Sequence, residues 1–474
     1  MNTRKKHAAL TAVIAAAAVC VLLTAAAAFY VKAALDGSHG RILENVYISS
    51  IDVGGMTKDE AVEAAETFAG HVDKKGVITM STGDKAKEIR AARFDIDYKS
   101  LRSADMAYDV GRKGNVFSRF FDIRRLKTDK KTVVLETAAD PARVNSILKR
   151  SSRYFTVREK DADLKNSNGR VSIIKERYGQ ILDRKKSAAS LKKDIREKWG
   201  RGRDITVKLA VIKQKPKRMA ADLQGMTDVL GTYETFYDKD QYNRCLNIAR
   251  GTALISGTIV KPGSTFSVYK KVKPFTADNG YYLAPTISGD KHEDDYGGGI
   301  CQVSTTLYNA VIRSELKIKE RHNHTQAIYY VPLSADAAIA GTSYDLKFMN
   351  DMKDAIYIQG RAKKSSVRFT VYGKDDRDRS RSVRFESVVL AVHKHGKKVV
   401  EKDPDLERGK ERIKEPGATG YDAQLWKIVL KNGEEVKRML FNSSHYKTVA
   451  EKVIKGTKKT KEKKKASGDD TGSL

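Results

Sequence analysis

The chain has 474 residues, and its 90 Lys and Arg against 59 Asp and Glu give a formal net charge of +31. This surplus indicates polyanionic surroundings such as nucleic acid, anionic lipid or an anionic cell wall, although a solvated basic surface has the same composition. The length predicts about three domains. Three cysteines exclude a disulfide scaffold, while a single bridge between Cys245 and Cys301 stays open.

A basic cluster and a long apolar run open the chain. A helix over 8–31 would be about 36 Å long at roughly 1.5 Å per residue, enough to cross a bilayer. The positive-inside rule places residues 1–7 in the cytoplasm and the bulk of the chain outside. A cleavable signal peptide is the alternative, since Ala33 and Ala34 follow the run. Because the run exceeds the roughly 7–15 residues of a signal core, we expect a single-pass membrane anchor, an extracellular chain and no nucleic-acid partner.

Region 38–212 alternates strands, glycine turns and helices, which predicts an α+β region. Its first segment is predicted as a strand over 42–53. A glycine turn follows, and then a helix that begins with Thr57 as N-cap and Glu60 three residues later, the pattern of a capping box. We find no catalytic constellation in this region.

Two basic stretches divide the remainder of the chain, at 213–218 and 374–381. Between them, 219–373 is predicted to form a second α+β domain. The stretch 382–456 alternates β-branched and polar residues between turns and predicts a small, mostly β domain. The basic end, 457–474, has the composition of a disordered tail. The fold class is therefore multidomain α+β.

The stretch YGGGICQVSTTLYNA, at 296–310, contains Cys301, the candidate catalytic residue. Its three glycines predict a loop whose backbone N–H groups can approach a ligand closely. A helix should follow, with its core face made by Val303, Leu307, Ala310 and Val311. The opposite, polar face then carries Cys301, Ser304, Thr305 and Tyr308. A cysteine at a helix N-terminus has a lowered thiol pKa, which favours a thiolate nucleophile.

The segment after this helix contains candidate bases for the thiol. The stretch 317–328 alternates like a strand, which would put His322 and His324 on one face about 7 Å apart. One of them can bond the sulfur and the other can orient a substrate, and the spacing does not say which. Asp345 is a candidate to hold the imidazole, although any nearby carboxylate or amide would serve.

Simpler interpretations remain open for the same residues. A lone cysteine is usually a buried small hydrophobe, and Cys245 fits that interpretation. Cys301 and the two histidines could instead bind zinc with His292 or Asp294, but no closely spaced ligand pair precedes the cysteine. The His-x-His pair could also belong to a solvent-facing strand without function.

The motifs GGGICQVSTTLYNA, ERHNH and SYDLKFMND together resemble the signature of the VanW family, over about 223–350. Upstream, VYISSIDVGGMTKDEA and FDIDYKS resemble the peptidoglycan-binding domain that often precedes VanW domains. Downstream, the glycine spacing is similar to that of the five-glycine domain of surface proteins, at Gly409, Gly417, Gly420, Gly433 and Gly456.

The resemblance implies an anchored cell-wall protein of Gram-positive bacteria that cross-links peptidoglycan stem peptides as an L,D-transpeptidase. Cys301 would form the acyl-enzyme, with His322 or His324 as base and Asp345 as its partner. Substrate and oxyanion would be bound by Gly298, Gly299, Gln302, Ser304 and Thr305. We expect no metal or cofactor, and we expect anionic wall polymers as further partners. The Ser-His-Gly motif before the cysteine of conventional L,D-transpeptidases is absent.

Two other functions fit the same resemblance. The chain could be a non-catalytic assembly factor that binds peptidoglycan or exopolysaccharide. It could also use water as the acyl acceptor, which would make it a carboxypeptidase.

Overall fold

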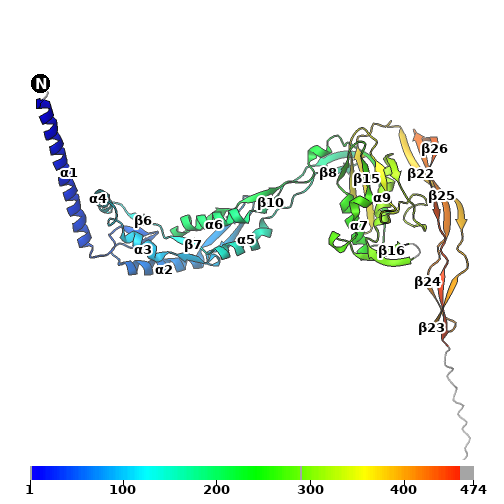
Figure 1. Cartoon of the computed structure of the whole chain (residues 1–474), viewed down its shortest axis with the longest axis horizontal. Coiled ribbons are helices and arrows are strands. Elements are labelled where there is room, and N and C mark those ends of the chain that lie inside the picture. The colour runs from blue at the N-terminus through cyan, green and yellow to red at the C-terminus, as the bar shows by residue number, and fades with distance from the viewer. Residues whose placement is uncertain (1–2, 289–290, 459–474) are drawn as a thin grey trace, which may run out of the picture. The chain divides into compact units, whose positions relative to one another are not determined.

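The chain folds into separate mixed helix–strand parts, shown in Figure 1. The structure is a computed structural model that describes residues 3–288 and 291–458. The chain divides into two compact units. Unit 1 comprises Met1–Lys160 and Arg177–Pro216, and unit 2 comprises Asp161–Glu176 and Lys217–Leu474. The predicted multidomain α+β class is confirmed, including an N-terminal apolar helix and a small C-terminal β domain.

Helix α1 (Thr3–Gly37) contains the apolar run. Its candidate membrane span is Lys6–Gly37, and an 18-residue window of this span has a mean hydropathy of 2.5 and is 6% buried. By length and composition this helix can cross a membrane, and a signal sequence near an N-terminus has the same properties.

The remainder of unit 1 packs small sheets against helices around two cores. Its further helices are α2 (Lys58–Lys75), α3 (Ser100–Tyr108), α4 (Val116–Arg125), α5 (Pro141–Phe155) and α6 (Arg184–Lys198). One sheet has the order β2-β1-β6 (Ile51–Asp52, Val46–Ile48, Lys131–Val133) and another the order β11-β3-β4 (Ile205–Lys208, Val77–Ser81, Ala86–Arg90). Two strand pairs complete it: β5 (Ile96–Tyr98) with β7 (Thr137–Ala139), and β10 (Gly179–Leu182) with β12 (Val211–Gln214).

The local predictions for this unit had mixed outcomes. The capping box at the start of α2 is present in both directions, between Thr57 and Glu60. The single strand predicted over 42–53 is wrong, because the chain reverses direction at Ser49, whose φ is 54°. The segment therefore forms the two short paired strands β1 and β2.

Unit 2 is built on the four-stranded antiparallel sheet β13-β21-β20-β14 (Asp228–Phe236, Ser366–Gly373, Ile356–Ala362, Thr258–Val260). Its helices are α7 (Tyr242–Ile255), α8 (Val268–Val272) and α9 (Ile300–Arg313). A second sheet has the order β15-β19-β18 (Thr265–Ser267, Lys347–Met349, Lys317–Glu320), and β16 (Leu283–Ser288) pairs with β17 (Lys291–Tyr296). The core between these layers contains Val303, Leu307, Ala310 and Val311, the predicted core face of α9.

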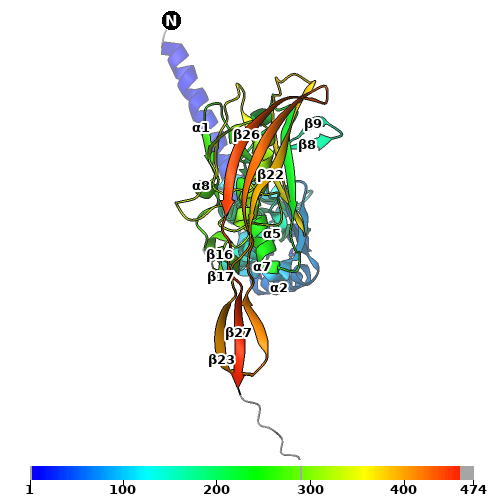
Figure 2. The same ribbon diagram turned by 90° about the vertical axis from the view of Figure 1, so that its right-hand side faces the viewer.

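The C-terminal part of unit 2 consists of two long, three-stranded sheets. The first has the order β22-β25-β26 (Arg381–His393, Gly420–Lys431, Glu434–Tyr446). The second has the order β23-β27-β24 (Val399–Glu407, Lys452–Lys458, Glu411–Glu415), and Figure 2 shows β23 beside β27. Leu425 of the first sheet is 1% exposed within the core cluster that also contains α9, so this sheet packs on the α9 layer.

Two features of the fold cross boundaries that the sequence analysis placed between domains: a group of ion pairs and a hairpin. Glu315, just after α9, pairs with Arg377, Arg381 and Lys427, so the basic stretch 374–381 is held against the α9 layer. The hairpin β8 (Asp163–Ser167) and β9 (Arg170–Ile174) interrupts the region expected to run from 38 to 212. It packs in unit 2, where the amide of Gln359 donates to Asp163 at 2.7 Å.

Candidate functional site

The glycine loop fixes where α9 begins. Gly299 caps the helix with φ 103°, a left-handed conformation that favours glycine. A Cβ on Gly298 would lie 2.8 Å from the backbone oxygen of Ala284, so this position is also restricted to glycine by close packing. The loop therefore delivers Cys301 to the first turn of α9, as predicted.

The polar face predicted for α9 is buried rather than open. Ser304, Thr305 and Tyr308 are all completely buried, because the segment 331–340 and the sheet β22-β25-β26 cover this side. Thr305 accepts a hydrogen bond from the backbone N–H of Ala337 at 3.0 Å, and the Tyr308 hydroxyl donates to Asn442 at 2.8 Å. Cys301 therefore lies at the edge of a packed layer.

The environment of the Cys301 thiol favours the thiolate. Burial raises the pKa of this thiol, but the hydrogen bond and the positive charge of His324 outweigh burial and hold the pKa below its ordinary value of 9.0. The backbone N–H of Ile339 donates to the sulfur at 3.5 Å and stabilises the same charge. Both Cys245 and Cys301 are free, so no bridge blocks this chemistry.

His324 is held by a buried carboxylate that the sequence analysis did not single out. Its Nδ1 lies 2.6 Å from Oδ2 of Asp336, and its backbone N–H donates to the same oxygen at 2.7 Å. Burial lowers the pKa of His324, but the bond to Asp336 and the interaction with Cys301 raise it to about 10. Since Nδ1 is engaged, Nε2 is the nitrogen left to face the sulfur.

Asp336 is itself supported on its other oxygen. The side chain is fully buried, and Oδ1 accepts hydrogen bonds from Arg321 at 2.9 Å and from the Tyr446 hydroxyl at 2.6 Å. Burial raises the pKa of this carboxyl, but its bond to His324 and the nearby positive charges hold the pKa below its usual value. Tyr446 belongs to β26, so the C-terminal sheet contributes to the support of the site.

The strand predicted over 317–328 is wrong, and with it the shared face of the two histidines. Strand β18 ends at Glu320, because the chain then turns inward to bury Arg321 against Asp336. His322 leaves in another direction: its ring stacks on Tyr344 at 4.5 Å, and Nε2 lies 3.4 Å from Glu320. The structure brings His324, and not His322, to Cys301.

Asp345 does not hold an imidazole. Its carboxylate accepts a hydrogen bond from the Ser267 hydroxyl at 2.5 Å and another from the backbone N–H of Tyr269 at 2.9 Å. These bonds fix the start of α8. Asp336 occupies the position that was predicted for Asp345.

The predicted oxyanion donors differ in what they contact. The amide nitrogen of Gln302 donates to Thr235 at 3.0 Å and to the backbone of Phe236 at 2.9 Å, so both its N–H groups are engaged away from the thiol. Among the described residues, no acceptor is found for the backbone N–H of Cys301 itself. The hydroxyl of Ser304 is likewise buried without a partner in the described part of the chain. The roles of Gly298 and Gly299 as donors stay predictions.

Asp336, Arg321, Tyr446 and Tyr330 are the site residues that the sequence analysis missed. Tyr330 lies close enough for the charge of Cys301, after burial, to raise the pKa of its phenol. All four are distant from the cysteine in sequence, and only the fold brings them together. One signal was available: a single aspartate in the apolar stretch 331–340 is unusual unless its charge is paired.

A different group of residues is close enough together to hold a metal ion. Ligand atoms of His393, Asp422 and His445 lie within 4.8 Å of one another on neighbouring strands of the C-terminal sheet. The zinc site considered for Cys301 is disfavoured by the position of His322. The side chain of His292 lies outside the described residues.

Comparison with known families identifies three domains. The family described as "VanW like protein" matches residues 243–372, and the family described as "Putative peptidoglycan binding domain" matches 88–202. The G5 domain family matches 393–458. The predicted resemblance is confirmed.

Curated relatives agree with these matches. YoaR of Bacillus subtilis (strain 168) is 36% identical over 149 residues, covering 31% of this chain and 49% of YoaR. The vancomycin B-type resistance protein VanW of Enterococcus faecalis (strain ATCC 700802 / V583) is 31% identical over 116 residues, covering 23% of this chain and 42% of that protein. The chain therefore spans about half the length of these relatives, or less.

Solved structures of G5 domains also align. That of IgA1 protease is 28% identical and covers 16% of this chain and 90% of its own, with a TM-score of 0.13. That of HP0197 is 18% identical and covers 16% and 95%, with a TM-score of 0.11.

The domain order defines a cell-wall-associated protein of the VanW and YoaR type. Within it, the chain contains a VanW-like domain between a domain of the peptidoglycan-binding family and a G5 domain, and the site around Cys301 lies in the VanW-like domain.

Proposed function

We propose that the chain is a cysteine-dependent acyltransferase that cross-links peptidoglycan stem peptides, an L,D-transpeptidase. One observation supports this above all: Cys301, His324 and Asp336 form a connected series of thiol, imidazole and buried carboxylate. This is the arrangement that activates a cysteine nucleophile on many unrelated folds. The buried-hydrophobe alternative for Cys301 does not account for the hydrogen bond between its thiol and His324, and the metal alternative is disfavoured because the ring of His322 stacks on Tyr344 instead.

The reaction follows from the positions of these groups. The Cys301 thiolate attacks the carbonyl carbon of the bond between the diamino acid and the terminal D-Ala of a donor tetrapeptide. The C–N bond breaks, the His324 imidazolium gives its proton to the leaving D-Ala nitrogen, and a thioester remains on Cys301. An acceptor amine then attacks the thioester and passes a proton to His324, and Cys301 leaves as thiolate.

Two further groups assist this scheme. The backbone N–H of Cys301, for which the described residues offer no acceptor, provides a donor for the developing oxyanion, in place of the amide of Gln302. Asp336 keeps the Nδ1 proton of His324 in place, so that Nε2 alone exchanges a proton with the substrate.

The setting of the site agrees with this substrate. The family of residues 88–202 is named for peptidoglycan binding, and the formal charge of +31 matches an anionic wall. In this proposal α1 anchors the chain as a single span, with residues 1–7 inside and the bulk of the chain extracellular.

The test is to incubate the full-length chain in detergent with disaccharide-tetrapeptide and to analyse the products by mass spectrometry. We expect cross-linked dimers and a thioester adduct on Cys301. The Cys301→Ala variant should give neither, whereas Cys245→Ala, which changes the other cysteine outside α1, should give both. Dimers in the absence of Cys301, or none with the unchanged chain, would overturn the proposal. Release of D-Ala without dimers would identify a carboxypeptidase, and binding without any product would identify an assembly factor.

A further inference from the structure

The guanidinium of Arg244 lies beside the start of α9 without a counter-charge. Its Nη2 donates to the side-chain oxygen of Gln302 at 2.6 Å, and a Cβ on Gly299 would lie 3.0 Å from its Cγ. The other terminal nitrogen, Nη1, is buried and has no hydrogen-bond partner among the described residues. In the same part of the chain, no carboxylate forms an ion pair with Arg244.

This position is unusual for a positive charge. Arg244 belongs to the first turn of α7, and its side chain reaches the cap residue of α9, so it lies near the positive ends of two helix dipoles. A cation at a helix N-terminus is destabilising, and a buried donor without a partner is destabilising in addition. A local conflict of this kind is typical of a functional site, and an anion bound there would remove it.

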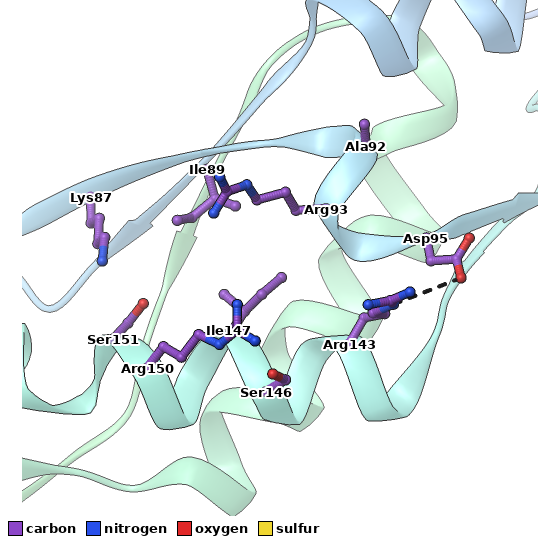
Figure 3. A pocket seen from close by; sticks show the side chains of 10 residues that line it. All are labelled: Lys87, Ile89, Ala92, Arg93, Asp95, Arg143, Ser146, Ile147, Arg150 and Ser151. Atoms are coloured by element: carbon purple, nitrogen blue, oxygen red, sulfur yellow. Dashed lines mark ion pairs between the residues drawn. The ribbon is translucent and has the colours of Figure 1, made fainter.

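Other arginines of the chain lack this property. A cavity between β4 and α5 in unit 1, shown in Figure 3, is lined by Arg93, Arg143 and Arg150. These three are exposed, so water and salt screen their charges. On α7 itself, Arg250 donates from Nε and from Nη2 to Asn279, at 2.6 and 2.7 Å. Arg244 differs from all of them in having a buried nitrogen that is still free to donate.

The guanidinium is also close to the reacting thiol. Gln302, which holds Nη2, directly follows Cys301 in α9. Burial raises the pKa of the Tyr330 phenol, the charge of Cys301 raises this pKa further, and the charge of Arg244 opposes both effects, so both charged groups lie near this phenol. In the proposed reaction, the carboxylate of the terminal D-Ala comes directly after the bond that the thiolate attacks. A bound donor therefore has this carboxylate near the sulfur, on the same end of α9 as Arg244.

We propose that Arg244 binds the C-terminal carboxylate of the donor peptide and makes the site selective for peptides that end one residue after the bond that is cut. The inference rests on the proposed function, whose donor it specifies. Arginine suits this role because its planar fork forms charge-assisted hydrogen bonds with carboxylates. Gln302 holds the fork through Nη2 and leaves Nη1 for the ligand. The residue as a whole is partly exposed, so a peptide at the surface can reach its side chain.

The test compares two donors in single-turnover acylation of the full-length chain in detergent: a disaccharide-tetrapeptide and the same compound with a C-terminal amide. The amide keeps the bond that is cut and lacks the terminal charge. Because charge-assisted hydrogen bonds are the strong ones, the acid should acylate Cys301 at least about tenfold faster than the amide. Arg244→Gln should slow acylation by the acid at least about tenfold and leave the amide within about threefold. The matched control, Arg250→Gln, removes the same charge from the same helix and should keep the preference for the acid.

Two results would overturn the inference. Equal rates with acid and amide in the unchanged chain would do so whether or not the Arg244 variant folds. An equal loss with both donors in Arg244→Gln would show that the arginine only supports the start of α9.

A binding measurement separates this inference from the proposed reaction. Fluorescent forms of the acid and the amide are titrated with the Cys301→Ala chain, and binding is measured by anisotropy. If the unchanged chain forms no acyl adduct with either donor, the proposed function fails. A preference for the acid that Arg244→Gln removes, and Arg250→Gln does not, would still support the carboxylate site, and its absence would refute that site as well.

Discussion

Replacing Asp336 with Asn tests the site most directly. The substitution keeps the shape of the side chain and removes the charge that faces His324 and Arg321. The pKa of His324 is raised from 6.5 to about 10, and at about 1.36 kcal/mol per pKa unit this corresponds to a net stabilisation of the imidazolium on the order of 5 kcal/mol. Asp336 and Cys301 provide this stabilisation against the opposing effect of burial.

The expected loss of activity follows from the same interactions. Without the carboxylate, the imidazole is no longer held in the orientation and tautomer that the thiol needs. Acylation of Cys301 should slow by about 10³- to 10⁴-fold, equivalent to roughly 4–5.5 kcal/mol of activation free energy. The assay is single-turnover acylation by tetrapeptide, followed by intact mass. The pH dependence of thiol alkylation should shift in parallel, because the pKa of His324 falls and the thiolate–imidazolium pair is then lost at lower pH.

Asp345→Asn is the matched control, because the sequence alone predicted this aspartate as the partner of the imidazole. It bonds Ser267 and Tyr269 instead, so acylation should change by less than about threefold. Asp336→Asn also leaves the buried Arg321 without its counter-charge, which costs about 3–5 kcal/mol of stability. Rates are therefore compared where circular dichroism shows both variants folded. A folded Asp336→Asn chain with more than a tenth of the parent rate, or equal losses in the two variants, would refute this reasoning.

Three further predictions concern neighbouring residues. His324→Ala should reduce acylation by at least about 10²-fold, whereas His322→Ala, which removes a ring stacked on Tyr344, should stay within about threefold; a larger loss in His322→Ala would contradict the assignment of the base. Tyr446→Phe removes the hydroxyl that bonds Asp336 and accepts from Ser334, and it should lower the unfolding free energy by about 1–3 kcal/mol, measured by urea denaturation. Burial raises the pKa of Glu315, but its ion pairs outweigh burial and lower the pKa from 4.5 to about 2. Their stabilisation is thus complete above pH 4.5 and is lost as the pH falls through about 2; Glu315→Gln should cost on the order of 3 kcal/mol at pH 7 and much less near pH 2, and an equal loss at both pH values would exclude this cause.

Local patterns in the sequence correctly predicted those structural features that depend only on residues close together in the chain. The capping box at Thr57 and the apolar face of α9 follow from spacings of three and four residues, and both are present. The position of Cys301 in the first turn of α9 follows from the glycines before it. These features are decided within one or two helical turns, so a single sequence contains them.

Features that depend on distant packing were not predictable in the same way. Alternation over 317–328 suggested a strand, but burial of Arg321 against Asp336 ends the strand at Glu320 and sends the two histidines apart. Which aspartate bonds the imidazole, Asp336 or Asp345, depends on which loop covers α9. No local pattern in the sequence indicates that loop. The contribution of Tyr446 depends on the packing of the C-terminal sheet on the α9 layer.

The bond between Tyr446 and Asp336 also has a consequence for the order of assembly. Tyr446 ends β26, far behind Cys301 along the chain. If residues 1–7 stay inside and the part of the chain after α1 crosses the membrane in sequence order, the cysteine is outside before β26 has followed. The support of Asp336 then becomes complete only near the end of secretion, so the thiol would acquire its full reactivity once almost the whole chain has reached its destination.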